Sequence, residues 1–277
     1  MKSKLLLLSC LACFGGIAPT LAAPPEVRTR LVTPMAQPVI DRAEAAFASL
    51  EGWSATIVIE DYYFQGKETR WFGSITERFL KGEGSPNFYS CASFSDGNSI
   101  PMSVRVQNNT AAYRIDRAMN GKIMAQASVP DDGFNQPVLQ GGFLQIARGA
   151  QYVCYGGREE VNGQTCDVVE CSSVNMASAT PDQPERPVSL DHYRYFVDPA
   201  GIVVRVKSNR INFASPAATE NADARPPAAG WVDWRLDRFD AKAKPATEEF
   251  SREAFDRVAA TMLKPGEAMP EVTEQLF

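Results

Sequence analysis

The stretch from residue 151 to 171, QYVCYGGREEVNGQTCDVVEC, predicts two β-strands folded back on each other. At its centre is Asn162-Gly163, the preferred pair for a two-residue type I′ turn, because both residues tolerate positive φ. If these residues form the turn, Arg158 faces Asp167 and Cys154 faces Cys171 across the hairpin. The cysteines then occupy a non-hydrogen-bonded pair, where Cα atoms approach to about 4.5 Å, a separation that a disulfide accepts.

The same register divides the hairpin into two faces. The charged Arg158–Asp167 pair lies on one face, and we take the other as buried. The members of the predicted buried face are Val153, Tyr155, Val161, Cys166 and Val168. Gly156 and Gly157 leave an alternative open, because a β-bulge there shifts the register and separates Cys154 from Cys171.

The N-terminus has the layout of a secretory signal, with Lys2 and Lys4, an apolar run at 5–17 and small residues at 18–23. The apolar run is shorter than the roughly 20 residues of a membrane-spanning helix. We expect a signal peptide at 1–23, cleaved after Ala22 or Ala23, and a periplasmic protein.

Two further expectations concern this end of the chain. Lipidation at Cys10 or Cys13, which would give an outer-membrane lipoprotein, is an alternative that the short apolar run disfavours. Residues 24–37 have no hydrophobic period and are interpreted as an exported spacer.

Charge and length limit the function classes. Cleavage removes two lysines and no acid, so 28 basic residues become 26 against 33 acidic ones, and the net charge becomes −7. Such a charge disfavours nucleic acid as a partner. The remaining length suits one all-β or α+β domain, which we place at 38–277 and expect to be a monomer.

The expected mature chain has four cysteines, and an even number in an oxidising compartment suggests two disulfides. Cys166 and Cys171 are five positions apart on one predicted strand and point to opposite faces, so they cannot pair. The hairpin register favours Cys154 with Cys171, which leaves Cys91 for Cys166. One histidine and no C-x2-C pair after residue 23 argue against a metal site.

Hydrophobic periodicity predicts an α+β chain dominated by an antiparallel meander. Apolar residues recur at helical spacing from Pro38 to Leu50, and Ser251 is a candidate cap for a closing helix. Asn120-Gly121 predicts a second tight turn, and Asp198 to Gly201 predicts a type I turn. Besides the hairpin, strands are predicted at 53–64, 70–80, 87–94, 100–107, 111–119, 122–128, 190–197, 202–213 and around 232–237. Polar or Ala/Pro-rich loops are predicted at 174–189 and 214–230.

Residues 130–149 interrupt the strands. Pro130 to Gly133 has turn chemistry, and an apolar helical segment with Gly141-Gly142 inside it follows. Because paired glycines weaken or kink a helix, two interpretations stay open: a helix that closes one end of the sheet, or a mobile flap.

Three segments carry a resemblance to a known family. They are IDRAEAAFASL from Ile40, VNGQTCDVVE from Val161 and YFVDPAGIVVRV from Tyr195. Over residues 38–260 the chain resembles the periplasmic lipoprotein-carrier superfamily (LolA/LolB-like). The resemblance implies a curved antiparallel half-barrel whose apolar concave face is covered by helices. It also implies a lipid or an acylated protein as the ligand.

The sequence offers no catalytic constellation. His192 is the only imidazole, and no nucleophile motif such as G-x-S-x-G lies near it. We therefore expect no enzyme, no catalytic residue and no cofactor.

Apolar side chains of the first helix, the early strands and the 130–149 segment could form core or line a cavity for an acyl chain. The candidates for lining such a cavity are Phe47, Trp53, Ile57, Ile59, Trp71, Ile75, Phe79, Phe88, Phe143 and Ile146. The leading hypothesis is an exported lipid or lipoprotein carrier. The alternative is an envelope sensor or interaction protein that docks a protein partner on the same fold.

Overall fold

The computed structural model describes residues 30–65, 68–82, 87–94, 101–117, 122–130, 140–177, 186–212, 230–263, 266–268, 270 and 272–274. The predicted signal peptide, the Asn120-Gly121 turn and residues 131–139 lie outside the described residues. So does the 214–230 loop, apart from Gly230.

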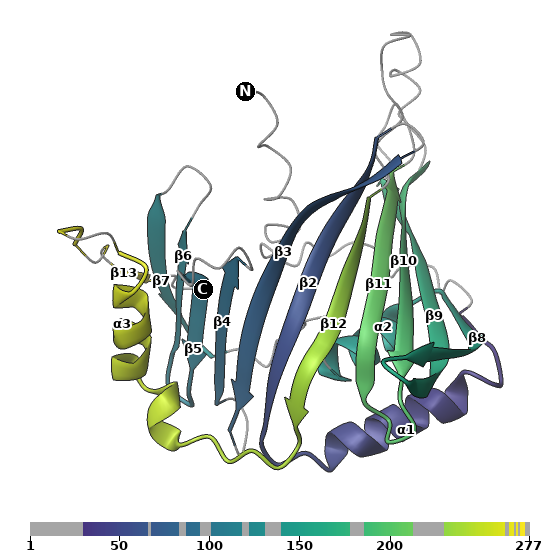
Figure 1. Ribbon diagram of the computed structural model, residues 1–277, viewed down its shortest axis with the longest axis horizontal. Coiled ribbons are helices and arrows are strands. Elements are labelled where there is room, and N and C mark those ends of the chain that lie inside the picture. Colours follow the sequence, from purple (N-terminus) through teal and green to yellow (C-terminus); the bar gives the residue numbers. More distant parts are fainter. Residues whose placement is uncertain are drawn as a thin grey trace, which may run out of the picture.

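The described chain is a large curved sheet with a few helices, which confirms the predicted α+β class (Figure 1). The first elements are β1 (Leu31–Val32), α1 (Gln37–Ala48), β2 (Trp53–Gln65), β3 (Glu68–Lys81), β4 (Phe88–Phe94), β5 (Pro101–Gln107), β6 (Ala112–Arg117) and β7 (Ile123–Ser128). The next are α2 (Gln140–Gly149), β8 (Tyr152–Val161), β9 (Gln164–Ala177), β10 (Arg186–Val197), β11 (Val203–Asn212) and β12 (Gly230–Asp240). A 3-10 helix (Thr247–Phe250), α3 (Arg252–Ala260) and β13 (Val272–Glu274) follow.

The strands form one sheet in the order β1-β8-β9-β10-β11-β12-β2-β3-β4-β5-β6-β7-β13. All neighbours are antiparallel except at the two edges, where β1 lies parallel to β8 and β13 parallel to β7. Part of the predicted spacer is therefore an edge strand, because Leu31 pairs with Tyr152 and Val32 with Val153. Short strands of this kind shield the edge of a sheet from other chains.

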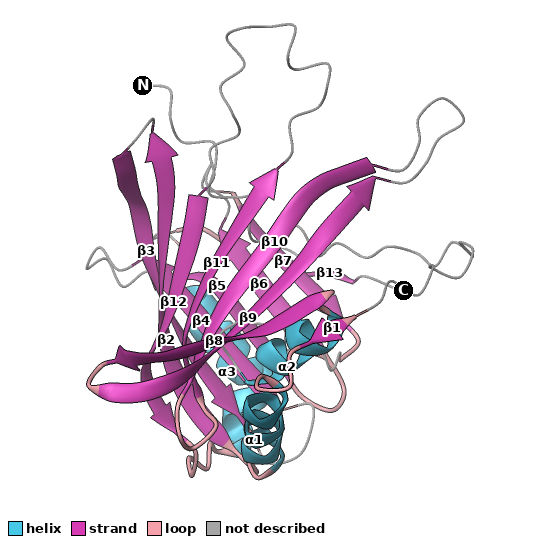
Figure 2. Ribbon diagram, turned by 90° about the vertical axis from the view of Figure 1, so that its right-hand side faces the viewer, coloured by secondary structure: helices cyan, strands magenta, loops and turns pink. Residues whose placement is uncertain are grey.

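The sheet bends around α1 and α2 (Figure 2), so we call the face that carries them the inner face and the opposite one the outer face. Trp53, Lys81 and Phe88 lie side by side on the inner face, and Trp53 and Phe88 pack in the cluster that contains α1 and α2. The next residue along each of these strands points to the outer face, because side chains alternate between the two faces of a sheet. Leu80 and its neighbour Tyr89 accordingly belong to a separate cluster with α3.

The two clusters show how the helices divide the sheet. The inner cluster joins α1, α2 and strands β2, β4 and β8–β11, with half-buried β12 side chains packed against it. The α3 cluster covers the outer face of β3–β7, where the ring of Phe255 lies 5.7 Å from that of Tyr113. The Ser251 side chain caps α3 by accepting a hydrogen bond from the Ala254 amide at 3.1 Å, as predicted. The predicted helical cover is therefore present, but it is shared between two faces.

The hairpin has the predicted turn but only part of the predicted register. Asn162 and Gly163 have φ values of 51° and 76°, as a type I′ turn requires. Arg158 lies opposite Asp167, as predicted, with Nε 3.1 Å from a carboxylate oxygen. A bulge between Tyr155 and Gly157 then shifts the register.

The bulge makes the predicted pairing of Cys154 with Cys171 wrong. Val153 lies opposite Cys171, and Cys154 lies opposite Glu170. Gly156 suits the bulge because a Cβ there would lie 2.9 Å from a Val168 methyl group. A β-bulge at Gly156 and Gly157 was the alternative interpretation of the hairpin, and the structure contains it.

The bulge also splits the predicted buried face, because a shift of one residue turns later side chains to the opposite face. Val153 and Tyr155 lie on the inner face. The remaining three form a small outer-face cluster with Phe196 and a half-buried Val204; they are Val161, Cys166 and Val168.

All four cysteines after residue 23 are free thiols in the structure. Five strands separate β4, with Cys91, from β9, with Cys166, which at about 4.8 Å per strand is far beyond disulfide reach. Burial raises the pKa of the Cys91 thiol, and it raises that of Cys171 to about 12. These two thiols are therefore protonated and weakly nucleophilic at neutral pH.

Candidate ligand-binding face

Helix α1 packs on the inner face through Val39, Ile40 and Ala43, and a turn and an ion pair also contact it. The Asp198–Gly201 turn closes with a 3.0 Å hydrogen bond from the Gly201 amide to the Asp198 carbonyl, as predicted. Gly201 has a φ of 87°, and a Cβ there would lie 2.7 Å from the Arg42 carbonyl oxygen. Glycine is thus needed twice, for the turn and for the close approach of α1.

Asp167 of the hairpin binds α1 directly. Burial by itself would raise the pKa of Asp167, but hydrogen bonds from Arg42, Tyr155 and Arg158 offset it, and the pKa is lowered. The Arg42 guanidinium lies 2.6 Å from one carboxylate oxygen, and the Tyr155 hydroxyl donates to the other at 2.9 Å. The hairpin and α1 are therefore coupled through one carboxylate.

Helix α2 covers the inner face beside α1. Its residues Phe143, Leu144 and Ala147 are buried in the inner cluster. Arg30 donates to the Ala147 carbonyl at 2.7 Å, and Arg148 pairs with Glu44 of α1 at the surface. Gly142 lies in the first turn of α2, not at a kink in its middle. The described helix thus closes the sheet, as one of the two interpretations predicted, while the segment before it is not described.

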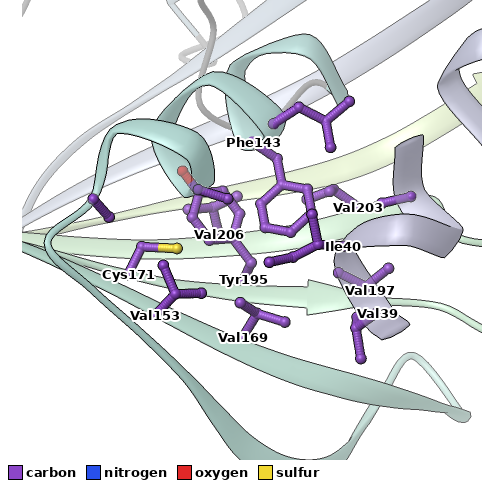
Figure 3. Close-up of a cluster of buried hydrophobic side chains, with 14 of the residues drawn as sticks. Val39, Ile40, Phe143, Val153, Val169, Cys171, Tyr195, Val197, Val203 and Val206 are labelled. Atoms are coloured by element: carbon purple, nitrogen blue, oxygen red, sulfur yellow. The ribbon is translucent and has the colours of Figure 1, made fainter. Parts of the chain in front are cut away.

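The phenol of Tyr195 lies at the centre of this face. Its side chain is fully buried, and its ring centroid is 4.6 Å from that of Phe143 (Figure 3). The hydroxyl has no hydrogen-bond partner among the described residues. An unsatisfied buried hydroxyl costs about 1–3 kcal/mol, so this group needs an explanation.

The structure places the predicted lining residues in three settings. Four are buried in the inner cluster, namely Trp53, Ile57, Phe88 and Phe143. Three are half-buried on the same face or on α2, namely Ile59, Ile75 and Ile146. Phe47 is different, because it is 39% exposed near the end of α1. The side chains of Trp71 and Phe79 lie outside the described residues.

The prediction missed the lining contributed by the later strands. Tyr195, Val206 and Trp234 lie side by side across β10, β11 and β12, and Trp234 lies next to Ile59 of β2. Alternation in the predicted strands 190–197 and 232–237 indicated an apolar face, but not which helix covers it. The apolar surface therefore runs across strands from both ends of the chain.

The inner face changes character beyond β3. Opposite Ile57 lies Glu77, which is only 8% exposed, and the buried polar residues Ser90 of β4 and Gln107 of β5 lie on the same face of the sheet. Burial raises the pKa of Glu77 to about 7, although a hydrogen bond from Ser90 and the charge of Arg114 oppose the shift. Arg105, which donates to Gln107 at 2.9 Å, and Arg114 continue this polar region.

His192 lies on the outer face of the sheet, away from the apolar cluster. The Ser172 hydroxyl lies 2.8 Å from His192 Nδ1 on the outer face. Asp191 points to the other face and binds Arg210, so it does not orient the imidazole. Among the described residues, no three His, Cys, Asp or Glu side chains gather as metal ligands. In the same part of the chain, no helix has the length and apolar character needed to cross a bilayer.

Comparison with known proteins gave structural matches alone. No family model matches the chain, and no curated protein does. The crystal structure of LprF from Mycobacterium bovis is similar, with a TM-score of 0.41 and 15% identity, over 78% of this chain and 98% of that one. A LolA superfamily protein from Nitrosomonas europaea has a TM-score of 0.30 and 10% identity, over 79% and 98%.

The MucA/MucB complex of Pseudomonas aeruginosa is also similar, with a TM-score of 0.34 and 13% identity, over 79% of this chain and 62% of that one. The fold described above is a curved antiparallel sheet bent around an opening helix, as the three sequence segments predict.

Proposed function

We propose that this protein is an exported, non-enzymatic binder or carrier of lipid or lipoprotein acyl chains. The observation that carries the proposal is the apolar inner face, which continues from α2 across β12 and β2. Trp234, Ile59 and Leu236 lie on it only half-buried, next to the fully buried Ile57 and Tyr195.

Burial of an acyl chain against this face is favourable. Each CH₂ group of an acyl chain that leaves water for such a surface gains about 0.8 kcal/mol. A binding protein also needs a cover that excludes water, and α1 and α2 already lie on this face. The N-terminal secretory layout supports export to the compartment where such ligands travel.

Two tryptophans on one strand make a direct test. Trp234 lies on the inner face, whereas Trp231 is an odd number of positions away and stacks on Tyr62, with ring centroids 4.0 Å apart, on the outer face. Variants that keep only one of the four tryptophans, with the others changed to Phe, would be titrated with a brominated fatty acid. We expect strong quenching of Trp234 and little quenching of Trp231.

Native mass spectrometry of protein purified from the periplasm provides the second measurement. We expect a fraction of molecules to carry a bound lipid. Equal quenching of the two tryptophans, together with protein that is always empty, would contradict the carrier proposal. That result would favour the alternative, in which the fold docks a protein partner.

A further inference from the structure

The Tyr195 hydroxyl is the one polar group that points into the apolar cluster around α2 without a hydrogen-bond partner among the described residues (Figure 3). Its neighbours on the sheet are Val169 and Val206, directly opposite on β9 and β11. Burial raises its pKa well above the ordinary value, so the phenol is protonated and is a hydrogen-bond donor.

Phenylalanine would satisfy the packing at this position equally well, because the ring contacts with Phe143 and Tyr193 do not involve the hydroxyl. Buried hydroxyls normally have a partner, and an orphan one lowers the stability of the closed protein. A hydrogen-bond acceptor that arrives with a ligand would remove this penalty.

Helix α2, the element that lies against Tyr195, is held mainly by the apolar contacts of Phe143, Leu144 and Ala147 and has few polar ties among the described residues. Helix α2 has ten residues, a length that is marginal for a helix without tertiary support. Apart from its apolar contacts, it is held by the Arg30 bond to the Ala147 carbonyl and by the exposed Arg148–Glu44 pair. Exposed pairs of this kind contribute little stability.

We propose that Tyr195 is a specificity-determining residue, whose hydroxyl donates to the carbonyl oxygen of an acyl ester or acyl amide when α2 moves away. The inference rests on the proposed function and deepens it, because it names the chemical group of the ligand that the protein recognises. The acyl chain then packs on the apolar surface that Phe143 and Leu144 had covered. Its carbonyl oxygen accepts a hydrogen bond from the Tyr195 hydroxyl.

A matched pair of ligands tests the hydrogen bond. Monopalmitoylglycerol and hexadecylglycerol have the same chain length and the same head, but only the first has a carbonyl. We expect the intact protein to bind the ester about 3- to 10-fold more tightly than the ether, the usual effect of one neutral hydrogen bond. Tyr195→Phe should bind both with the affinity of the ether.

The unliganded protein provides a second readout that a merely structural role would not produce. Tyr195→Phe should raise the melting temperature by about 2 °C or more, because it removes an unsatisfied polar group. Tyr193→Phe, on the same strand and the same face, is the control, and we expect it to leave the preference for the ester unchanged.

Hydrogen exchange tests the displacement of α2. On addition of the ester, the amides of residues 140–149 should lose protection while those of β10 keep theirs. Unchanged or greater protection of α2 would overturn the proposed displacement.

The outcomes separate this inference from the proposed function. If neither ligand binds, the carrier proposal fails. If both bind equally to the intact protein and to Tyr195→Phe, the carrier proposal stands and the role of Tyr195 is refuted.

Discussion

The inner face is apolar over one half and more polar over the other, although Phe88 of β4 still packs in the apolar inner cluster. On β8–β12 and β2 it presents buried apolar side chains such as Val153, Tyr195 and Ile57, and two helices cover it. On β3–β6 the same face presents Glu77 and Arg105, and the helix that packs against β5 and β6 lies on the outer face. The position of the helices follows this difference, because an apolar face needs cover and a polar one does not.

The difference in polarity also limits where the proposed acyl ligand can lie. Glu77 occupies the boundary, opposite Ile57 on β2 and Ala92 on β4. A carboxyl group in that position opposes extension of an apolar ligand toward β5, since removing a polar group from water without a partner costs free energy. The proposed ligand face is therefore the half beneath α1 and α2.

The largest expected effect is the loss of stability when a buried side chain in the apolar half is shortened and leaves a cavity. Ile57→Ala removes a fully buried side chain from the apolar half, and we expect the free energy of unfolding to fall by about 3 kcal/mol. Ser103→Ala in the polar half removes one 2.7 Å hydrogen bond to Asp116, and we expect a loss of about 1 kcal/mol or less. Urea denaturation measures both, and equal losses would remove the distinction between the halves.

Replacing Glu77, the residue at the boundary between the two halves, should change how the stability of the protein depends on pH. The pKa of Glu77 is raised from 4.5 to about 7 in the folded protein, so its contribution to stability is complete below pH 4.5 and is lost as the pH rises through 7. Glu77→Gln should lack this slope and at pH 8 should be more stable than the unchanged protein by about 3 kcal/mol.

Denaturation midpoints measured from pH 4 to 8 check the expectation for Glu77. Glu160→Gln, at an exposed position of the hairpin, is the control and should keep the slope. A slope that survives in Glu77→Gln would mean that Glu77 is not buried in the polar half as described.

The smallest expected effect concerns the attachment of α1 to the apolar half. The pKa of Asp167 is lowered from 3.8, so its stabilising contribution is present above pH 3.8 and is lost as the pH falls through the folded pKa. Asp167→Asn should lower stability by about 1 kcal/mol at pH 7, and the difference should vanish in strong acid.

Thermal unfolding of Asp167→Asn and of the control Asp237→Asn, whose side chain is half exposed, measures this contribution. If Asp167→Asn matches the control at pH 7, the link between the hairpin and α1 contributes nothing measurable.

Much of the fold was predictable because local rules agree with it. Hydrophobic pattern predicted strands β2 to β12, although β9 and β10 extend into the predicted 174–189 loop, because their backbones pair with each other there. Helical spacing predicted α1, and Asn162-Gly163 predicted the turn that is observed. Part of the inner face was predictable as well, since Trp53, Ile57 and Phe143 were named and pack in the inner cluster.

Other features depended on interactions that local rules do not describe. The bulge at Gly156 depends on the contact with Val168 across the hairpin, and it moved Cys154 away from Cys171 and turned Val161 to the outer face. Nothing local to Tyr195 indicated that Phe143, 52 positions earlier in the sequence, would lie against it.

The sequence by itself determined most of the helices and strands and the turns at Asn162-Gly163 and Asp198–Gly201, because these depend on backbone preferences and on hydrophobic period. The tertiary structure alone decided which face of each strand is inner, which helix covers it and which polar groups are left without a partner. Those properties depend on register and on contacts between distant segments, and a shift of one residue reverses them.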